Sequence, residues 1–415
     1  MKNYYVVDRC RMCNNKNLIL AVKVGTSPVA DKYLKSPKDK SKILKASLDL
    51  YFCKSCKHLQ LNDVINPDYL WSGYTFQSNT FNKKLVNHFK KTSLKLKRKY
   101  RNLKKNDFIL DIGSNDGSLL KAFKDVGFKN ILGIDAAKNI VRDANKKGIK
   151  TFYGYFNGKN AKKILIKKGH PKIITSFNAF AHSDNIIEIT KSIKKILDKN
   201  GIFIFEASYL LDVVKKLLLG TIFHEHLDYH SVEVLNKFFN IHNLKLFKVE
   251  RNEGQGGSIV GYVQHYDGPY KNDKSVIKMI NMEKKMELNN LRTFKKFETR
   301  LQKSKVKITN MFKSIKKRGY SISAFGSSIS STTYLSYYNI GKYINFIVDD
   351  NKLKQRKFTP KDLIKIYPSD HLKKNLTDYI IIFAWVHTDR IIKNLKQEGY
   401  KRAKFITLYP EIKII

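Results

Sequence analysis

The densest group of titratable side chains lies in residues 220–239, GTIFHEHLDYHSVEVLNKFF. A histidine titrates near neutral pH and can remove a proton from a bound molecule as a general base. In an extended segment, His224 and His226 face one side and Glu225 the other. The pattern lacks the His-Glu-x-x-His spacing of a metal site on a helix. It therefore predicts proton transfer, and we assign a structural role to the next histidine, His230.

A further histidine, His182, lies in the run SFNAFAHSDN, directly after an apolar stretch at 172–177. That stretch reads as a strand, and His182 then lies at its carboxyl end. The carboxyl ends of parallel strands meet at one edge of an open α/β sheet, where ligands bind. We expect His182 and His226 to lie near the same crevice.

All four cysteines of the chain occur in two C-x2-C pairs, at Cys10, Cys13, Cys53 and Cys56. Two such pairs can present four thiolates to one tetrahedral Zn²⁺. A site with four thiolates leaves no open position on the metal, so it is structural and not catalytic. The alternatives are two redox dithiols or four unrelated thiols, and the exclusive pairing favours zinc over both.

A glycine-rich turn lies within residues 109–123, ILDIGSNDGSLLKAF, between a predicted strand and a helix start. Gly113 and Gly117 let the backbone approach a ligand and tolerate positive φ. Asp135 ends the next predicted strand, 22 residues after Gly113. A spacing of ~20 is expected for a carboxylate that accepts hydrogen bonds from a ribose diol. The pattern predicts a ligand that contains a nucleoside.

The charge of that ligand follows from Asp111 at the end of the first strand. The turn lacks the G-x-G-x-x-G that accommodates a pyrophosphate, and a carboxylate here opposes a phosphate. It suits the amino and sulfonium groups of S-adenosylmethionine (SAM). The pattern resembles motif I of the class I SAM-dependent methyltransferases, with Asp135 as their ribose carboxylate. We place Asn115, in the turn, and Asn178, after the third strand, with the cofactor-binding residues.

Apolar strands alternating with amphipathic stretches must position these residues, as in the βαβ units of a parallel sheet. The predicted strands of the central region are 108–113, 131–136, 172–177 and 202–207. A second α/β region follows a long charged helix, with predicted strands at 321–326, 344–350, 379–385 and 404–409.

We therefore predict an α/β protein with a Rossmann-like class I SAM methyltransferase core. A small zinc-binding domain at 1–65 precedes it, and a Rossmann-like α/β domain at 319–415 follows it. The methyltransferase domain spans 66–275, and its first part, 66–100, is an aromatic and helical lead-in. A helix at 276–318 connects it to the C-terminal domain.

The composition limits the classes of partner. The chain has 415 residues with 80 Lys and Arg against 35 Asp and Glu, a net charge of +45. The lysines are spread through every segment, whereas a nucleic-acid binder concentrates them on one face or in a tail. We attribute the excess to a general compositional bias, which still helps to collect an acidic small substrate. We find no long apolar run and no signal-peptide core, and we expect a cytoplasmic protein without membrane contact.

Nearly the whole chain resembles the sugar C-methyltransferases that act on nucleotide-linked 4-keto-deoxysugars. The matching stretches, between residues 10 and 390, are CRMC, VGTSPVADKYL, YFCKSCKHLQL, GYTFQSNTFNKKLVNHF, LDIGSNDGSLL, SFNAFAHSDNI, FEASYL, FHEHLDY, GQGGSIVGYV, AFGSSISSTTYL and IIIFAWVHTDRII. The resemblance implies SAM and structural zinc as cofactors and a nucleotide-sugar as the substrate, which the C-terminal domain helps to hold.

The resemblance also implies roles for single residues. His226 matches the residue thought to act as base, and Glu225, His182 and Tyr74 match residues that line the same site. A carbon beside a ketone becomes a nucleophile once its proton leaves. Tyr74 or His182 could then stabilise the enolate oxygen, and Glu225 could orient the histidine or stabilise its charge. His182 and His224 are the alternative bases.

The chain departs from the family pattern at four places. Phe223 and Phe76 stand where tyrosines are common, Val260 where an arginine is usual, and Ser330 begins a run in place of a Lys-Gly-Asn turn. These changes bear on the substrate more than on the class of reaction.

Two other functions stay open at this stage. A SAM-dependent enzyme could methylate a hydroxyl or another acceptor with the same base. A zinc-ribbon protein could use its charge to bind nucleic acid, although we find no RNP-like aromatic run and no helix-turn-helix pattern. The sequence leaves open the sugar, the nucleotide, the methylated atom, the pathway and the oligomeric state, with a monomer compatible.

Overall fold

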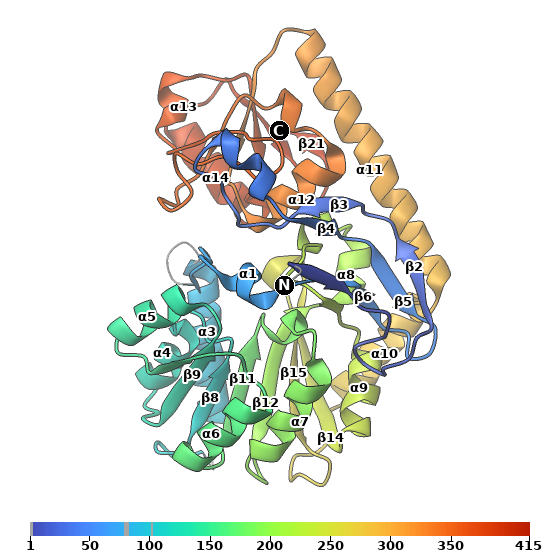
Figure 1. The fold of residues 1–415 in the computed structure, drawn as a ribbon, viewed down its shortest axis with the longest axis vertical. Helices are drawn as coiled ribbons and strands as arrows, with labels where there is room; N and C mark the ends of the chain where they lie inside the picture. Colours follow the sequence, from blue (N-terminus) through green and yellow to red (C-terminus); the bar gives the residue numbers. More distant parts are fainter. Residues whose placement is uncertain (1–2, 79–82, 101–102) are drawn as a thin grey trace.

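The computed structural model describes residues 3–78, 83–100 and 103–415. Residues 79–82, in the predicted lead-in, lie outside the described residues. Figure 1 shows a lower part around a large sheet, small blue strands at mid-height and an upper part that contains the C-terminus. A long helix runs along one edge from the middle to the top.

The lower part is built on a sheet of seven strands within the described residues, in the order β10-β9-β8-β11-β12-β15-β14. All neighbours are parallel except β15, which runs antiparallel to both β12 and β14. The strands are β8 (Ile109–Ile112), β9 (Ile131–Asp135), β10 (Thr151–Tyr153), β11 (Ile173–Phe177), β12 (Ile202–Ser208), β14 (Leu244–Asn252) and β15 (Ser258–His265). This is the predicted class I methyltransferase sheet, and all four predicted central strands are present in it.

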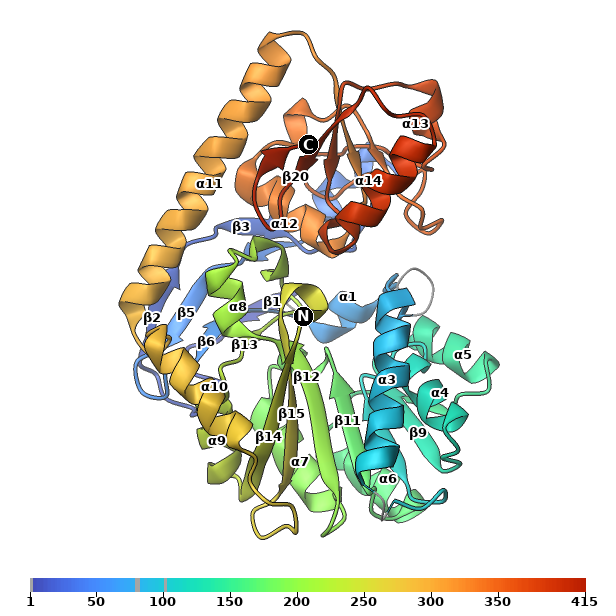
Figure 2. The same cartoon turned by 180° about the vertical axis from the view of Figure 1, so that it is seen from behind.

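Helices cover both faces of this sheet, with α6 and α7 on one face and α3 on the other (Figures 1 and 2). The helices of this part are α1 (Pro67–Trp71), α3 (Lys83–Lys99), α4 (Ser118–Asp125), α5 (Lys138–Lys146), α6 (Gly158–Lys168), α7 (Ile186–Ile196), α8 (Leu210–Lys215) and α9 (Val232–Ile241). Side-chain oxygens of Asn157, Asn185 and Ser231 cap α6, α7 and α9, which satisfies amides that lack a partner in the first turn.

The N-terminal segment forms short antiparallel strands. They are β1 (Tyr4–Val6), β2 (Leu18–Val22), β3 (Thr26–Pro28), β4 (Lys45–Ser47), β5 (Leu50–Cys53), β6 (Leu59–Leu61) and β7 (Asp63–Ile65). Among the described strands, β2, β5 and β6 form one sheet with β13 (Asp228–Tyr229), which comes from the methyltransferase part of the chain. The two parts are therefore joined through a shared sheet.

The segment expected as one connecting helix consists of α10 (Lys274–Lys285) and α11 (Leu291–Lys317). The upper part has a sheet in the order β18-β17-β16-β19-β20-β21 over the described chain. Its elements are β16 (Ile322–Phe325), α12 (Ile329–Tyr338), β17 (Ile347–Val348), β18 (Ile366–Tyr367), α13 (His371–Lys374), β19 (Tyr379–Ile382), α14 (Thr388–Gln397), β20 (Lys404–Thr407) and β21 (Lys413–Ile414). All pairings are parallel except that of β21.

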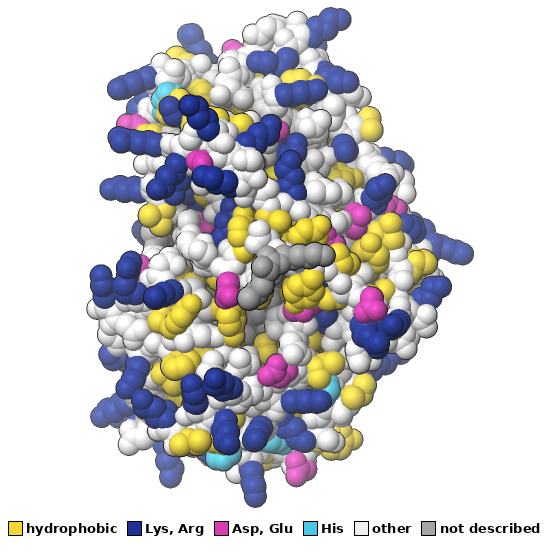
Figure 3. Space-filling view, in the orientation of Figure 1, with side chains coloured by type: hydrophobic (Ala, Val, Ile, Leu, Met, Phe, Trp, Pro, Cys, Tyr) yellow, Lys and Arg dark blue, Asp and Glu magenta, His cyan; other side chains and the backbone are white. Residues whose placement is uncertain are grey.

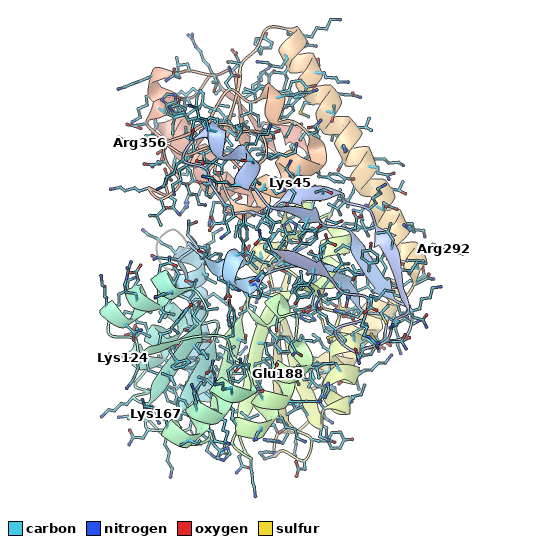
Figure 4. All side chains as sticks on the ribbon, viewed as in Figure 1. Lys45, Lys124, Lys167, Glu188, Arg292 and Arg356 are labelled. Atoms are coloured by element: carbon cyan, nitrogen blue, oxygen red, sulfur yellow. The ribbon has the colours of Figure 1, made fainter. Side chains whose placement is uncertain are left out.

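Basic side chains are distributed widely. Figure 3 shows Lys and Arg over the upper and lower parts of one face, while apolar and acidic side chains gather between them. Of the exposed basic residues that Figure 4 labels, Lys124 and Lys167 lie at the lower left, Arg356 at the upper left and Arg292 at the right. This face therefore carries no single basic stripe. In the described part of the chain, no helix combines the length and apolarity needed to cross a bilayer. The cytoplasmic location stays a prediction.

Candidate active site

A cavity of about 450 Å³ lies where the three parts of the chain meet. Its walls come from the lead-in around Trp71 to Ser78, from the carboxyl ends of β8, β9 and β11, from residues 220–226, and from the upper part around Ser328 and Trp385. The predicted site residues that line it are Tyr74, Asp111, Gly113, Asn115, Asp135, Asn178, His182, Glu225 and His226. The sheet edge and the upper part together enclose one site.

One side of the cavity carries the glycine-rich turn. Gly113 has φ +71, and a side chain there would clash with Ala179, since its Cβ would lie 2.4 Å from that of Ala179. Gly117 has φ +76 and precedes α4. Asn115 is also left-handed, with φ 48. These backbone conformations explain why the turn requires glycine at two positions and tolerates asparagine at the third.

Two carboxylates flank this turn. The oxygens of Asp135 accept hydrogen bonds from the backbone N–H of Asn115 and of Ala137, both at 2.8 Å. Asp111 accepts one from the Thr175 hydroxyl at 2.6 Å. Burial raises the pKa of Asp111 to about 7, against that hydrogen bond, and burial also raises the pKa of Asp135. A cation stabilises a buried carboxylate in its charged form, so Asp111 fits the amino and sulfonium groups of SAM, and Asp135 stays the carboxylate expected at the ribose.

The other side of the cavity carries the histidines. The rings of His182 and His226 are stacked with centroids 5.1 Å apart. The Phe223 ring is tilted against His226 with centroids 3.9 Å apart, and Trp71 stacks on His182 with centroids 6.0 Å apart. Burial lowers the pKa of His226 to about 4 and that of His182 well below its ordinary value, to which the neighbouring His226 contributes. Both rings are therefore neutral at pH 7.

The tautomer of His226 follows from its hydrogen bond. Nδ1 of His226 lies 2.8 Å from the carbonyl oxygen of Thr221. Since a carbonyl only accepts, Nδ1 carries the proton, and Nε2 is left to accept another one. The Thr221 carbonyl therefore orients the His226 ring, which is one of the two roles that the sequence left open for Glu225.

Glu225 has a different neighbour. The Tyr74 hydroxyl donates to Glu225 Oε2 at 3.3 Å. Burial raises the pKa of Glu225 to about 8, and the negative charge of Asp31 adds to that shift. At neutral pH Glu225 is therefore mostly protonated, so its carboxyl group can donate a hydrogen bond. Asp31 is itself held by the backbone N–H and the hydroxyl of Thr75, at 2.8 and 2.6 Å.

The prediction that His224 and His226 share one face is wrong. The chain turns here, because the backbone N–H of His226 donates to the carbonyl of Phe223 at 2.9 Å. Glu225 and His226 consequently both line the cavity. His224 is buried on the other side, where its Nε2 lies 3.2 Å from the carbonyl oxygen of Ala46. The turn thus separates His224 from the two residues that the cavity contains.

The four cysteines come together in the N-terminal domain. Sγ of Cys10 lies 3.4 Å from that of Cys56, and Sγ of Cys13 lies 3.6 Å from that of Cys53. All four sulfur atoms lie within 4.8 Å of one another. Tetrahedral Zn–S bonds of about 2.3 Å place sulfurs about 3.8 Å apart. The arrangement fits one structural Zn²⁺ with four thiolate ligands.

The upper part contributes cavity residues that the sequence did not indicate. Lys354 lines the cavity, and its Nζ donates to the carbonyl of Ser327 at 2.8 Å. The Tyr33 hydroxyl donates to the same carbonyl. Asp349 accepts from the backbone N–H of Ser327 at 2.6 Å. No motif marks these residues, because the contacts join Tyr33 of the N-terminal domain to two loops of the upper part.

The four departures lie in different surroundings. Phe76 and Phe223 line the cavity, as does Ser330, whose hydroxyl accepts from the Trp385 indole at 3.3 Å. Val260 is buried in β15, opposite Glu206 of β12. Three of the four therefore change the wall that faces a substrate.

Comparison with known proteins agrees with this arrangement. A family model described as "Putative zinc binding domain" matches residues 10–71, one described as "Methyltransferase domain" matches 86–249, and one described as "C-methyltransferase C-terminal domain" matches 253–410. The chain is 27% identical to C-methyltransferase NovU from Streptomyces niveus over 411 residues, which cover 99% of this chain and 97% of that protein.

Solved structures match part of the chain. Magnesium protoporphyrin IX methyltransferase (ChlM) of Synechocystis, with bound SAH, is 14% identical, covers 43% of this chain and 82% of its own, and has a TM-score of 0.34. The YcgJ protein of Bacillus subtilis is 16% identical, covers 43% of this chain and all of its own, and has a TM-score of 0.33.

The three family models and the full-length relative confirm the resemblance of the whole chain to C-methyltransferases. The protein is a SAM-dependent C-methyltransferase with a structural zinc domain.

Proposed function

We propose that this SAM-dependent C-methyltransferase acts on a nucleotide-linked 4-keto-deoxysugar and that His226 forms the enolate of that sugar. The observation that carries the proposal is the position of His226. A neutral imidazole with Nε2 available lines the same cavity as the carboxylates of the glycine-rich turn. The match to C-methyltransferases favours a carbon over a hydroxyl as the acceptor.

His226 is suited to take a proton and not to give one. Its lowered pKa keeps the ring neutral, and the Thr221 carbonyl holds the proton on Nδ1. A proton beside the keto group would move to Nε2, and its electron pair would remain on the sugar as an enolate. The Phe223 ring, tilted by 38° with its centroid 3.9 Å from that of His226, is close enough to stabilise the imidazolium that results.

The enolate oxygen needs hydrogen-bond donors. Glu225, protonated at neutral pH, is such a donor on the cavity wall, and the Tyr74 hydroxyl supports it by donating to its Oε2. Neither group adds a negative charge that would oppose the enolate. A donor placed in advance at a developing oxyanion stabilises the transition state. We assign this role to Glu225, with Tyr74 holding its carboxyl group and His182 as a further neutral donor.

The nucleotide is assigned to the upper wall. Ser328, Ser330 and Lys354 face the cavity there. Ser328 caps α12, whose first turn therefore points toward the cavity, and a helix N-terminus and a lysine both favour a phosphate. These features support a diphosphate linked to the sugar.

The C–H bond beside the ketone breaks and its proton goes to His226. SAM, when bound, supplies the methyl group as an electrophile. The enolate carbon forms the new C–C bond, while the S–CH₃ bond breaks and leaves its electron pair on sulfur. Asp111 and Asp135 hold the cofactor side, so the chain contributes positioning on both sides of the reacting atoms.

The test uses a panel of 4-keto-6-deoxyhexoses linked to thymidine, uridine or guanosine diphosphate. With SAM, the protein should give a C-methylated sugar, identified by mass spectrometry and NMR. With the demethylated cofactor in D₂O, it should exchange the hydrogen beside the ketone, and His226→Ala should not. Methylation of a sugar hydroxyl, or exchange by His226→Ala at the wild-type rate, would overturn the proposal.

A further inference from the structure

The segment that carries Glu225 and His226 is held by the zinc-binding domain. Beyond His226, β13 pairs antiparallel with β6, with Asp228 opposite Gln60 and Tyr229 opposite Leu59. The backbone N–H of Leu61 donates to the carbonyl of Leu227 at 2.9 Å. Before His226, the His224 ring reaches the carbonyl of Ala46. The cavity segment is thus bonded to the N-terminal domain on both sides of His226.

One side-chain contact joins the second cysteine pair, Cys53 and Cys56, to this segment. Nε2 of His58, two residues beyond Cys56, lies 2.7 Å from Oδ1 of Asp228, two residues beyond His226. Both side chains are fully buried. Within the described residues, Nδ1 of His58 and Oδ2 of Asp228 have no other hydrogen-bond partner. This contact is therefore the main polar interaction of both side chains.

The first cysteine pair, Cys10 and Cys13, encloses a residue that contacts the segment carrying His182. Arg11 lies between Cys10 and Cys13, and its side chain is almost completely buried. Its Nε donates to Oδ1 of Asp184 at 2.8 Å, and Nη1 donates to the carbonyl of Leu61. Asp184 lies two residues beyond His182 and lines the cavity. The first cysteine pair is thus linked to the His182 segment and the second pair to the His226 segment.

We propose that His58 and Arg11 are positioning residues, which hold the His226 and His182 segments in register through Asp228 and Asp184. The Thr221 hydrogen bond fixes the His226 ring only relative to its own loop. The stacked arrangement of the two rings, with centroids 5.1 Å apart, needs both loops to be fixed against a common support. The zinc-binding domain supplies that support. This inference rests on the proposed role of His226.

The test compares two variants of His58 in the full-length protein. His58→Leu removes the donor, whereas His58→Gln keeps an amide N–H near the place of Nε2. His170→Leu, an exposed histidine whose Nδ1 lies 2.9 Å from the carbonyl oxygen of Ile196, is the matched control. Zinc content is measured by elemental analysis, SAM affinity by calorimetry, and kcat and KM by methyl transfer to the accepted nucleotide-sugar.

We expect His58→Leu to lower kcat roughly 10- to 100-fold, since small displacements of reacting groups have effects of that order. Zinc content and SAM affinity should stay at wild-type values, and His58→Gln should recover most of the loss. Wild-type kcat in His58→Leu, or equal loss in the Leu and Gln variants, would overturn the inference. If His58→Leu does not fold, Asp184→Asn takes its place, with a lowered kcat expected and an unchanged one contradicting the proposal.

The two proposals fail in different ways. If His226→Ala exchanges the sugar hydrogen like the wild type, His226 is not the base, whatever His58 does. If His226→Ala loses exchange while His58→Leu keeps wild-type exchange and turnover, only the positioning role is wrong.

Discussion

The cofactor side and the histidine side of the cavity are built in different ways. On the cofactor side, a short continuous stretch supplies Asp111, Gly113 and Asn115, and backbone amides hold Asp135. On the histidine side, Tyr74, His182 and His226 come from segments far apart in the chain, and a second domain holds two of those segments. Local structure therefore shapes the cofactor side, whereas tertiary structure shapes the histidine side.

The electrostatics differ in the same way. The cofactor side holds two carboxylates whose charge a cationic ligand would stabilise. On the histidine side, burial keeps His182 and His226 uncharged and Glu225 mostly protonated at neutral pH. Two groups with pKa values shifted in opposite directions are typical of an acid and a base that act together. One side is suited to binding and the other to proton transfer, and substitutions can separate these roles.

The largest expected effect is on the histidine side. His226→Ala should lower turnover roughly 100- to 10,000-fold, the usual range for a positioned general base, because no neutral imidazole remains to take the proton. The SAM dissociation constant from calorimetry should stay within about twofold of the wild type. His170→Ala is the control. If His226→Ala lost SAM affinity as strongly as it loses turnover, the cofactor side and the histidine side would not be functionally separate.

The converse substitution is Asp135→Ala on the cofactor side. Hydrogen bonds to a charged group contribute about 1.5–3 kcal/mol, so SAM should bind roughly 10- to 150-fold more weakly. At saturating SAM, kcat should change little, because the histidine side is intact. Calorimetry and initial rates test this, with the exposed Asp125→Ala as control. Unchanged affinity would mean that Asp135 does not hold the cofactor.

The contrast also explains what the sequence could predict. The glycine-rich turn, the two cysteine pairs and the buried strands were predictable, because their determinants lie within a few residues of one another. The partner of His226 was not, since a backbone carbonyl such as that of Thr221 leaves no signature. Lys354 was not predicted either, because its place on the cavity wall depends on how the C-terminal domain packs. β14 was not predicted either. It alternates buried and half-exposed residues, which is a weaker pattern than the apolar runs of inner strands.

The pH dependence tests the opposite shifts on the histidine side. His226 must be neutral to accept a proton, so activity is lost as pH falls through about 4. Glu225 must be protonated to donate, so activity is lost as pH rises through about 8. The profile of kcat/KM should therefore be flat down to about pH 5.5, where an ordinary histidine with a pKa near 6.5 would already be mostly protonated.

Glu225→Gln sharpens this test, because the amide keeps a donor that does not titrate. At pH 9 the wild type should have lost roughly tenfold relative to its plateau, and the variant should lose much less. Initial rates between pH 5.5 and 9.5 measure both profiles. An unchanged decline above pH 8 in Glu225→Gln would assign that limb to another group.

The smallest expected effect is a gain in stability on the cofactor side. Burial raises the pKa of Asp111 to about 7 in the folded state, above its ordinary value of 3.8. At pH values above 3.8, the unfolded chain binds fewer protons at this group than the folded one does, so folding becomes less favourable as pH rises and the penalty is complete above about pH 7. Asp111→Asn removes that penalty and should raise Tm of the SAM-free protein at pH 8 by at least about 2 °C, with no gain near pH 4. The exposed Asp267→Asn is the control, and the Tm values of both variants are measured by calorimetry.

Asp111→Asn also removes the anionic partner of the cofactor, so SAM should bind more weakly and stabilise the variant less. A variant that is less stable than the wild type at pH 8 would show that the Thr175 hydrogen bond outweighs the burial of the charge.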